Sequence, residues 1–302
     1  MSSTAMAALL PGRGVVSVAG ADRAKFLQGL VTNDVRQLAP DRALYAGLLT
    51  PQGKLLYDFF LIEDGTRILI ETAADHTADL AKRLTLYKLR AQVEIADLSH
   101  AFRIAVAFGP GAAERLSLPP SEGAAGPGVL PGTHYAFIDP RLAGLGARLL
   151  HKAEGPPLEA ALSEAGFAPA READYAAHRL AEGIGDTAEI GGEVCYPLEA
   201  NFETLHGVDF KKGCYVGQEL TARMKHKGGL RKRVLPVAAP SDLPEAGTPV
   251  SAAGTELGTL IAAQGRQGLA LLRLDRLAEA SGGAITAGAV PLSVRWPSWL
   301  PR

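Results

Sequence analysis

The stretch KKGCYVGQE at residues 211–219 places one of the chain's two cysteines where its thiol could be reactive. Lys211 and Lys212 precede Cys214, and the residues after Gly217 lead into a predicted helix. Neighbouring cations and a helix N-terminus both favour the thiolate, which is the nucleophilic and metal-binding form. The alternative is a small, half-buried residue in a helix entry loop, because free cysteine packs like a hydrophobic residue. Cys214 is therefore a candidate reactive thiol, with Lys212 as the cation beside it.

The second cysteine and the nearby histidines give weaker signals. Cys195 lies in GGEVCYPLEA without a cationic neighbour, so a structural role is expected. The two cysteines lack CxxC spacing, and His206 and His226 do not form a ligand pair, so no zinc site is expected. A catalytic pair of Cys214 with either histidine stays open, because the sequence does not place these side chains in space.

Asp58 lies within the apolar stretch KLLYDFFLIE at residues 54–63, which is typical of a strand. Because side chains alternate along a strand, Asp58 is expected to share one face with Leu56 and Phe60, and the opposite face is apolar too. A carboxylate in such surroundings is hydrogen-bonded or paired, or else its pKa is raised. In a pocket it could accept hydrogen bonds from the N–H groups of a heterocyclic ring. The alternative is a structural aspartate that is satisfied inside the protein.

A charged pair precedes a glycine-rich stretch. Arg179 and Glu182 are three residues apart, so they share one face if this stretch is helical, and Gly183 and Gly185 are expected to end the helix. Facing a cleft, the pair could orient a polar ligand; more often such a pair is a surface salt bridge worth less than about 1 kcal/mol. Phosphate-binding glycine loops in a strand–loop–helix context and the GxSxG motif are absent from the sequence, so nucleotide binding and ordinary hydrolase chemistry have no support.

The composition is that of an ordinary globular protein, with 47% hydrophobic and 21% charged residues among 302. This length predicts two or three packed units. No apolar run reaches the roughly 18–20 residues of a membrane span, and no signal peptide is expected. Two cysteines favour a reducing compartment over a disulfide framework, so a cytoplasmic protein without membrane contact is expected.

Basic residues are concentrated in one stretch. Residues 211–233 contain eight Lys or Arg against one acid, whereas the rest of the chain carries 23 basic and 31 acidic residues. A basic stretch on an otherwise acidic protein favours an anionic partner at that place. The alternative is a solvated helix face followed by a charged loop.

The elements that position these residues are expected in grouped runs. A hairpin is predicted over residues 43–63 around the turn Pro51-Gln52-Gly53. A Pro- and Gly-rich segment at 117–132 is expected to be an exposed connection. Other predicted strands are 14–20, 66–72, 91–97, 101–109, 134–139 and 146–152, and predicted helices are 21–30, 75–90, 158–180 with a break near Gly166, and the stretch from 218 to Gly228-Gly229. This grouping predicts an α+β fold.

Beyond Arg233 the pattern changes to short apolar runs separated by turn residues, which is typical of a small β-barrel or sandwich. The last residues, 297–302, are expected to form a tail. We therefore predict one module over residues 1–232, built from two interwoven α+β subdomains, and a small β-barrel domain over residues 233–302.

With these features together, the chain resembles the YgfZ family, folate-binding proteins tied to iron–sulfur enzymes and related in fold to the glycine-cleavage T-protein. Residues 212–219 match the family signature K-G-C-[YF]-x-G-Q-E at every position. Three softer blocks support the resemblance in the same order: FLQGLVTNDV at 26–35, LLTPQGKLLYDFFL at 48–61, and RLAEGIG with PLEANF within 179–202.

The resemblance implies a T-protein-like folate-binding module around a central channel, followed by a small β-barrel. It implies a tetrahydrofolate-type ligand or a one-carbon derivative, with or without a polyglutamate tail. It further implies a role in assembling or repairing 4Fe–4S client proteins, including radical enzymes that modify tRNA. Cys214 would be a redox, cluster-contacting or one-carbon-accepting thiol, without a resident metal. The residues implied to hold the folate are Asn33, Tyr57, Asp58, Arg179, Glu182, Gln218 and Glu219.

Two other functions stay open. One is a tetrahydrofolate-dependent aminomethyltransferase, although the acidic pair of the T-protein is Tyr57-Asp58 here, and the T-protein lacks the cysteine signature. The other is an RNA-binding accessory module that uses the basic residues at 223–233. That stretch has no interleaved aromatic residues to stack on bases, so direct tRNA contact is not expected. The basic residues could instead receive an acidic partner or a polyglutamate tail.

Overall fold

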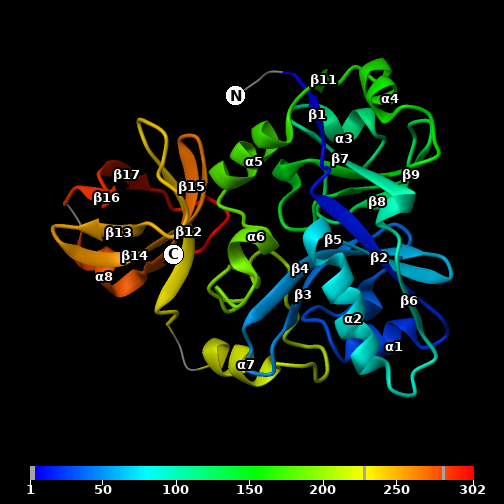
Figure 1. Ribbon diagram of the computed structural model, residues 1–302, viewed down its shortest axis with the longest axis horizontal. Coiled ribbons are helices and arrows are strands. Elements are labelled where there is room, and N and C mark those ends of the chain that lie inside the picture. The colour runs from blue at the N-terminus through cyan, green and yellow to red at the C-terminus, as the bar shows by residue number, and fades with distance from the viewer. Residues whose placement is uncertain (1–3, 227–228, 281–282) are drawn as a thin grey trace.

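The computed structural model describes residues 4–226, 229–280 and 283–302. The strands form two sheets and one closed barrel, with helices packed around them (Figure 1). Strands and helices occur in grouped runs, and nearly all strand pairs are antiparallel, so the predicted α+β fold is confirmed.

The first sheet has five antiparallel strands and contains Asp58. In order across the sheet they are β3 (Leu44–Leu49), β4 (Leu55–Asp64), β5 (Arg67–Ala73), β2 (Arg13–Ala19) and β6 (Glu94–Asp97). Helices α1 (Arg23–Gln28) and α2 (Thr77–Lys88) pack their apolar side chains against one face of this sheet. Leu80 and Leu84 of α2 are buried there with Phe59 of β4. The predicted hairpin is confirmed as β3 and β4.

The second sheet has six strands, with one short parallel pair at its edge. In order they are β11 (Ala168–Pro169), β1 (Met6–Leu9), β7 (Phe102–Phe108), β10 (Ala147–Lys152), β9 (Thr133–Ile138) and β8 (Ala125–Pro127). The predicted exposed connection at 117–132 is exposed over only part of its length. Strand β8 lies within it, and Leu118 and Leu130 are buried because they complete an apolar cluster beneath this sheet.

The remaining helices are short and lie in the connections. They are α3 (Ala112–Arg115), α4 (Leu158–Glu164), α5 (Glu172–Ala181), α6 (Thr187–Ile190), α7 (Gln218–His226) and α8 (Leu274–Glu279), with 3₁₀ turns η1 (Val35–Gln37), η2 (Ala74–His76), η3 (Ser99–Ala101) and η4 (Ala143–Leu145). The predicted break near Gly166 is confirmed, because this residue, with φ of +80°, separates α4 from α5. The predicted end of α7 was Gly228-Gly229. Lys227 and Gly228 lie outside the described residues.

The C-terminal strands close into a barrel, as predicted. They are, in order around it, β12 (Lys232–Ala238), β15 (Gln267–Arg273), β14 (Thr255–Gln264), β13 (Pro249–Ala252), β16 (Ile285–Ala287) and β17 (Val290–Val294). Residues 297–302 were predicted to form a tail, but this segment packs against the rest of the protein. Leu300 is buried, and the Trp299 indole donates a hydrogen bond of 2.9 Å to the Glu182 carbonyl, because the segment closes over the end of α5.

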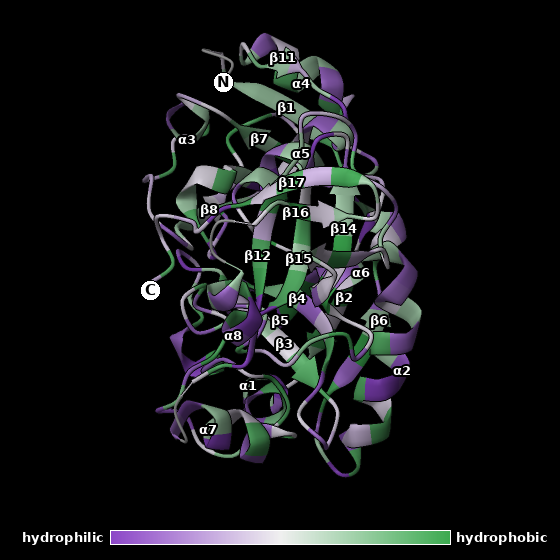
Figure 2. Cartoon of the chain, turned by 90° about the vertical axis from the view of Figure 1, so that its left-hand side faces the viewer, coloured by the Kyte–Doolittle hydropathy of each residue, from purple (hydrophilic) through white to green (hydrophobic). Residues whose placement is uncertain are grey.

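The largest core lies between the two sheets. Phe60 of β4 and Phe137 of β9 meet there with ring centroids 5.5 Å apart, and Tyr45 contacts Phe202 at 4.8 Å. Figure 2 shows β4 and β15 green along much of their length, whereas α8 and parts of α7 are purple. The polar side chains considered next lie on these strands and on the connections that cross them.

Candidate functional site

The cysteine loop (residues 211–217) holds Cys214 at the surface, next to the turn between β3 and β4. Cys214 is exposed and forms no disulfide. Gly217 has φ of +78°, and a Cβ at this position would lie 2.4 Å from the Thr50 carbonyl oxygen. Only glycine fits such an approach without displacing the backbone. The loop is therefore docked against the hairpin turn and presents a free thiol from a fixed position.

The first residues of α7 close the cysteine loop. The Tyr215 amide donates to the Gln218 side-chain oxygen at 3.1 Å, so this side chain organises the loop. Glu219, in the first turn of α7, is exposed. Both were predicted to bind folate, and that role stays a prediction.

Lys212 points into the protein beneath the cysteine loop. Its side chain is 8% exposed, and its ammonium donates to the carbonyl oxygens of Val31 and of Asn33, the latter at 2.8 Å. Burial lowers the pKa of Lys212 to about 8. The predicted effect of Lys212 on the thiol stays a prediction. The geometry gives it a structural task, since it fixes the cysteine loop to residues 31–33.

Cys195 differs from Cys214 in its burial. It is fully buried and free, and burial raises the pKa of its thiol to about 12. A thiol that keeps its proton at neutral pH is a poor nucleophile. The predicted structural role is confirmed by this environment.

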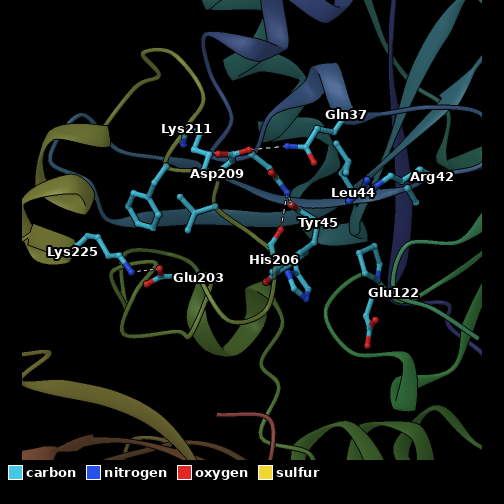
Figure 3. Close-up of a pocket in the computed structure, with 15 residues that line it drawn as sticks. Gln37, Arg42, Leu44, Tyr45, Glu122, Glu203, His206, Asp209, Lys211 and Lys225 are labelled. Carbon is cyan, nitrogen blue, oxygen red and sulfur yellow. Dashed lines mark hydrogen bonds and ion pairs between the residues drawn. The ribbon is translucent and has the colours of Figure 1, made fainter. Parts of the chain in front are cut away.

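A polar cavity of about 680 Å³ adjoins the first residue of the cysteine loop (Figure 3). It lies between β3 and the segment 203–211, with Lys225 of α7 at its rim. Its lining residues are Asn33, Gln37, Arg42, Ala43, Leu44, Tyr45, Glu122, Pro140, Glu203, His206, Val208, Asp209, Phe210, Lys211 and Lys225. Charges of both signs, amides and an aromatic ring thus face one space.

The charged side chains of the cavity are partly paired with one another. The Gln37 amide donates to Asp209 at 2.7 Å, and Lys225 forms an ion pair with Glu203. Figure 3 shows Lys211 and Lys225 on one side of the cavity and Arg42 on the other. A ligand with several carboxylates would find cations on both sides.

Asn33 lines the cavity and builds its wall. Its amide donates to the carbonyl oxygens of Tyr45 and His206, each at 2.7 Å, and its side-chain oxygen accepts from the Asp34 amide at 2.8 Å. His206 adopts φ of +57°, a conformation that side chains rarely adopt, and is exposed at the cavity. The two bonds that the Asn33 amide donates therefore hold β3 and the strained segment at 206 together.

Asp58 is fully buried outside the cavity. Tyr45 donates to one carboxyl oxygen at 2.9 Å, and the Thr187 hydroxyl contacts the other. Arg141 lies 3.9 Å away. Burial and the nearby charge of Asp186 raise the pKa of Asp58. These contacts match the alternative of an internally satisfied aspartate.

The predicted faces of β4 are correct only beyond its first residues. Leu48 pairs with Tyr57 and Leu49 with Leu55, so β4 carries a bulge with Leu56 as its extra residue. Leu55 therefore packs between the sheets and Leu56 packs beneath α2. The expected sharing of one face by Leu56 and Asp58 is therefore wrong. Phe60 is on the expected side.

Tyr57 lies on the opposite side of the sheet from Asp58, under α2. Its hydroxyl contacts Asp79 and accepts a hydrogen bond of 2.8 Å from Arg83. Burial raises its pKa to about 12. Because neighbours along a strand face opposite ways, Tyr57 and Asp58 do not converge on one pocket.

Arg179 and Glu182 do not form the expected pair. Arg179 binds Glu189 at 2.7 Å and Asp186 at 3.2 Å, because the chain reverses at Gly183 and α6 brings these acids back to α5. Glu182 is the C-cap of α5, and its carbonyl accepts the bond from the C-terminal tryptophan. Neither side chain lines the cavity.

The sequence did not indicate a chain of buried ion pairs that joins the two sheets. Arg148 of β10 binds Glu71 of β5 at 2.9 Å, and Arg141 binds Asp139 at 2.8 Å and Asp186 at 2.6 Å. The only signal is Arg148 inside the apolar stretch GARLLHK. The cavity residues between 203 and 209 were missed as well, because they lie in an aperiodic segment.

Two further features bear on function. Within the described residues, no group of three or more His, Cys, Asp or Glu side chains could hold a metal ion. In the same part of the chain, no helix has the length and apolarity to cross a membrane.

Two family descriptions match this chain. The GCVT N-terminal domain matches residues 12–119, and the C-terminal beta-barrel domain of CAF17 matches residues 231–302. Among solved structures, the glycine cleavage system aminomethyltransferase T from Bartonella henselae superposes with a TM-score of 0.76 at 14% identity, covering 99% of this chain and 87% of that one. The predicted T-protein-like fold with a terminal barrel is confirmed.

Named relatives are more similar in sequence. The mitochondrial iron–sulfur cluster assembly factor IBA57 of Homo sapiens is 35% identical over 314 residues, which cover 96% of this chain and 85% of the relative. The IBA57 homolog of Mycosarcoma maydis is 36% identical over 258 residues, 78% of this chain and 58% of the relative's length. These relatives bear the IBA57 name, so the narrower YgfZ resemblance stays a prediction. With this identity and coverage, the chain belongs to the IBA57 family of T-protein-like proteins.

Proposed function

We propose that this protein supports the assembly or repair of iron–sulfur proteins through the thiol of Cys214. The observation that carries the proposal is the exposed, free cysteine on a loop held by the buried Lys212 and the close-packed Gly217. The names of its relatives favour the same role.

One thiolate cannot hold a cluster alone. Iron–sulfur clusters are bound by about four cysteine thiolates or equivalent ligands, and the described residues offer no group of three that could bind a metal ion. Client proteins would supply the other ligands, with the cluster as cargo. We propose 4Fe–4S proteins as clients, including radical enzymes that modify tRNA, as the YgfZ resemblance implies.

The test replaces the thiol alone. We expect Cys214→Ala to lose nearly all rescue of 4Fe–4S enzyme activity in a null strain, because the ligand sulfur is removed. Its thermal unfolding should match wild type, since exposed substitutions change stability by about 0.5 kcal/mol or less. Cys195→Ala is the control: it removes the buried sulfur and should retain rescue. Full rescue by Cys214→Ala would refute the proposed role of the thiol.

We propose further that the cavity binds a tetrahydrofolate-type ligand, which when bound supplies one-carbon chemistry. Its volume lies within the roughly 300–1,000 Å³ of ordinary ligand pockets. Arg42, Lys211 and Lys225 could receive carboxylates of a glutamate tail, and Glu203 or Asp209 could accept from ring N–H groups. Of the residues implied by the resemblance to bind folate, only Asn33 lines this cavity.

Titration with 5-formyltetrahydrofolate separates two possible sites. If the cavity is the site, the double change Arg42→Ala and Lys211→Ala should weaken binding about tenfold, equivalent to 1.4 kcal/mol, and more for a polyglutamylated ligand. Asp58→Asn should then leave the affinity unchanged. If Asp58→Asn alone weakens binding, the folate occupies the site that the sequence predicted and not the cavity.

No specific observation favours the alternatives. The carboxyl of Asp58 has no exposed surface to offer an aminomethyl substrate, and Lys211 and Lys225 of the basic stretch face the cavity. We also propose a reducing compartment, which two free cysteines suit. The relatives are named as mitochondrial, and the cytoplasm stays a prediction for this chain.

A further inference from the structure

The C-terminal end of α2 carries an unusual concentration of exposed apolar side chains. Leu86, Tyr87 and Leu89 are 70%, 39% and 89% exposed, and they make up three of the six large apolar side chains that are exposed in the described chain. The inner side of the same helix is already packed, since Leu80 and Leu84 are fully buried against the first sheet. The exposed three therefore contribute little to the core.

Leu89 also adopts a backbone conformation that disfavours leucine. Its φ is +45°, in the region that favours glycine, so a side chain there costs free energy. With 89% of Leu89 exposed, packing inside the protein offsets little of that cost. The position is nevertheless well fixed: the Ala91 amide donates to the Lys88 carbonyl at 2.8 Å, and the Gln92 amide donates to Asp22 at 2.7 Å.

The surroundings of Leu89 are hollow and basic. A cavity of about 610 Å³ adjoins it, lined by Gly20, Ala21 and residues 88–94. Lys88 and Arg90 line this cavity on either side of Leu89, whereas of the nearby acids Glu94 lines it and Asp22 is held by the Gln92 amide beside it. An exposed apolar group is thus presented between two cations at the edge of a hollow.

We propose that this α2 tip (Leu86, Tyr87, Lys88, Leu89 and Arg90) binds a protein partner that presents apolar side chains next to carboxylates. Leucine and tyrosine supply the apolar anchors of an interface, and the two cations fit an acidic partner. A membrane is the weaker fit, because membrane binding needs a long apolar face, whereas this tip has three apolar side chains and an adjoining hollow. The proposal does not rest on the cysteine or on a folate.

In Figure 1, α1, α2 and α7 all lie along the lower part of the molecule, and Figure 2 shows the same arrangement from the side. The barrel lies on the opposite side of the molecule from α2 (Figure 1). A partner bound to the α2 tip would therefore not compete with the barrel for space.

The test uses a fluorescein-labelled peptide of alternating leucine and glutamate pairs, followed by fluorescence anisotropy with the full chain. We expect saturable binding that is weakened at least about tenfold by Leu86→Gln with Leu89→Gly. Leu89→Gly alone should leave thermal unfolding unchanged or raise its midpoint, because glycine relieves the backbone conformation while removing the apolar group. Val129→Gln, which replaces a 53% exposed valine elsewhere, is the matched control and should bind like wild type.

Several results would overturn the proposal. One is equal binding of a matched peptide with lysine in place of every glutamate, and another is undiminished binding by the double variant. Binding to phosphatidylcholine–phosphatidylglycerol vesicles without binding to the acidic peptide would assign the tip to a membrane. A dimer in sedimentation that the double variant abolishes, without peptide binding, would assign it to a second copy of the chain.

Discussion

At the scale of single residues, the KGC sequence places two neighbours in opposite environments. Lys212 is buried and donates to two carbonyl oxygens, whereas Cys214 is exposed. The lysine fixes the loop from below, and the cysteine is what the loop offers to the outside. Exposure and anchoring are therefore divided between two side chains of one short motif.

Replacing Lys212 tests its role as an anchor. We expect Lys212→Met to lower the free energy of unfolding by about 1–3 kcal/mol at pH 7, because the Val31 and Asn33 carbonyls lose their donor. The difference in free energy of unfolding between wild type and Lys212→Met should also depend on pH. The folded protein releases the Lys212 proton near pH 8, whereas an unfolded chain keeps it to about pH 10.4. The unfolded state then binds more protons between these values, so wild type should gain stability relative to the variant as pH rises from 8 to 10.

Denaturant titrations at pH 7, 8, 9 and 10 measure this difference. Lys211→Met serves as the control, since Lys211 is exposed and should change stability by about 0.5 kcal/mol or less. If the free energies of unfolding of wild type and Lys212→Met change in parallel with pH, the lowered pKa of the buried Lys212 is contradicted.

At the scale of elements, the sequence was sufficient where the signal is local. The turn Pro51-Gln52-Gly53 correctly joined β3 to β4, and apolar runs separated by turns correctly indicated the barrel. The bulge at Leu56 of β4 was not indicated by the sequence, because it depends on how two strands pair and not on the composition of either. It places Leu56 on the α2 side of the sheet, away from Asp58.

The candidate site was predictable to a similar degree. The cysteine loop has a contiguous signature, so its residues could be named in advance. The partners of Arg179 could not, because Glu189 returns to it only through the turn at Gly183. The cavity depends on segments distant in sequence, such as β3 and residues 203–211, and the pattern of neither segment indicates that they lie together.

At the scale of the whole molecule, the C-terminal segment ties the barrel to the rest of the chain. Trp299 packs against the small cluster of Leu145, Ile184 and Leu205, and its indole bonds to the end of α5. Arg295 donates to the Ala181 carbonyl at the same end. The barrel therefore caps α5, the helix that carries Arg179 into the buried ion pairs between the sheets.

Removing the Trp299 contact should uncouple the two parts. We expect Trp299→Ala to cost about 2–3 kcal/mol, since a half-buried indole and its hydrogen bond are lost, and to split calorimetric unfolding into two transitions. Trp296→Ala is the matched control, because Trp296 packs within the barrel cluster and should lower only the barrel transition. If Trp299→Ala unfolds like wild type, the C-terminal segment does not couple the barrel to the module. If it unfolds in two steps, Trp299 is required for the coupling, and the remaining contacts, such as Asn201 with Val234 and Arg295 with Ala181, do not suffice without it.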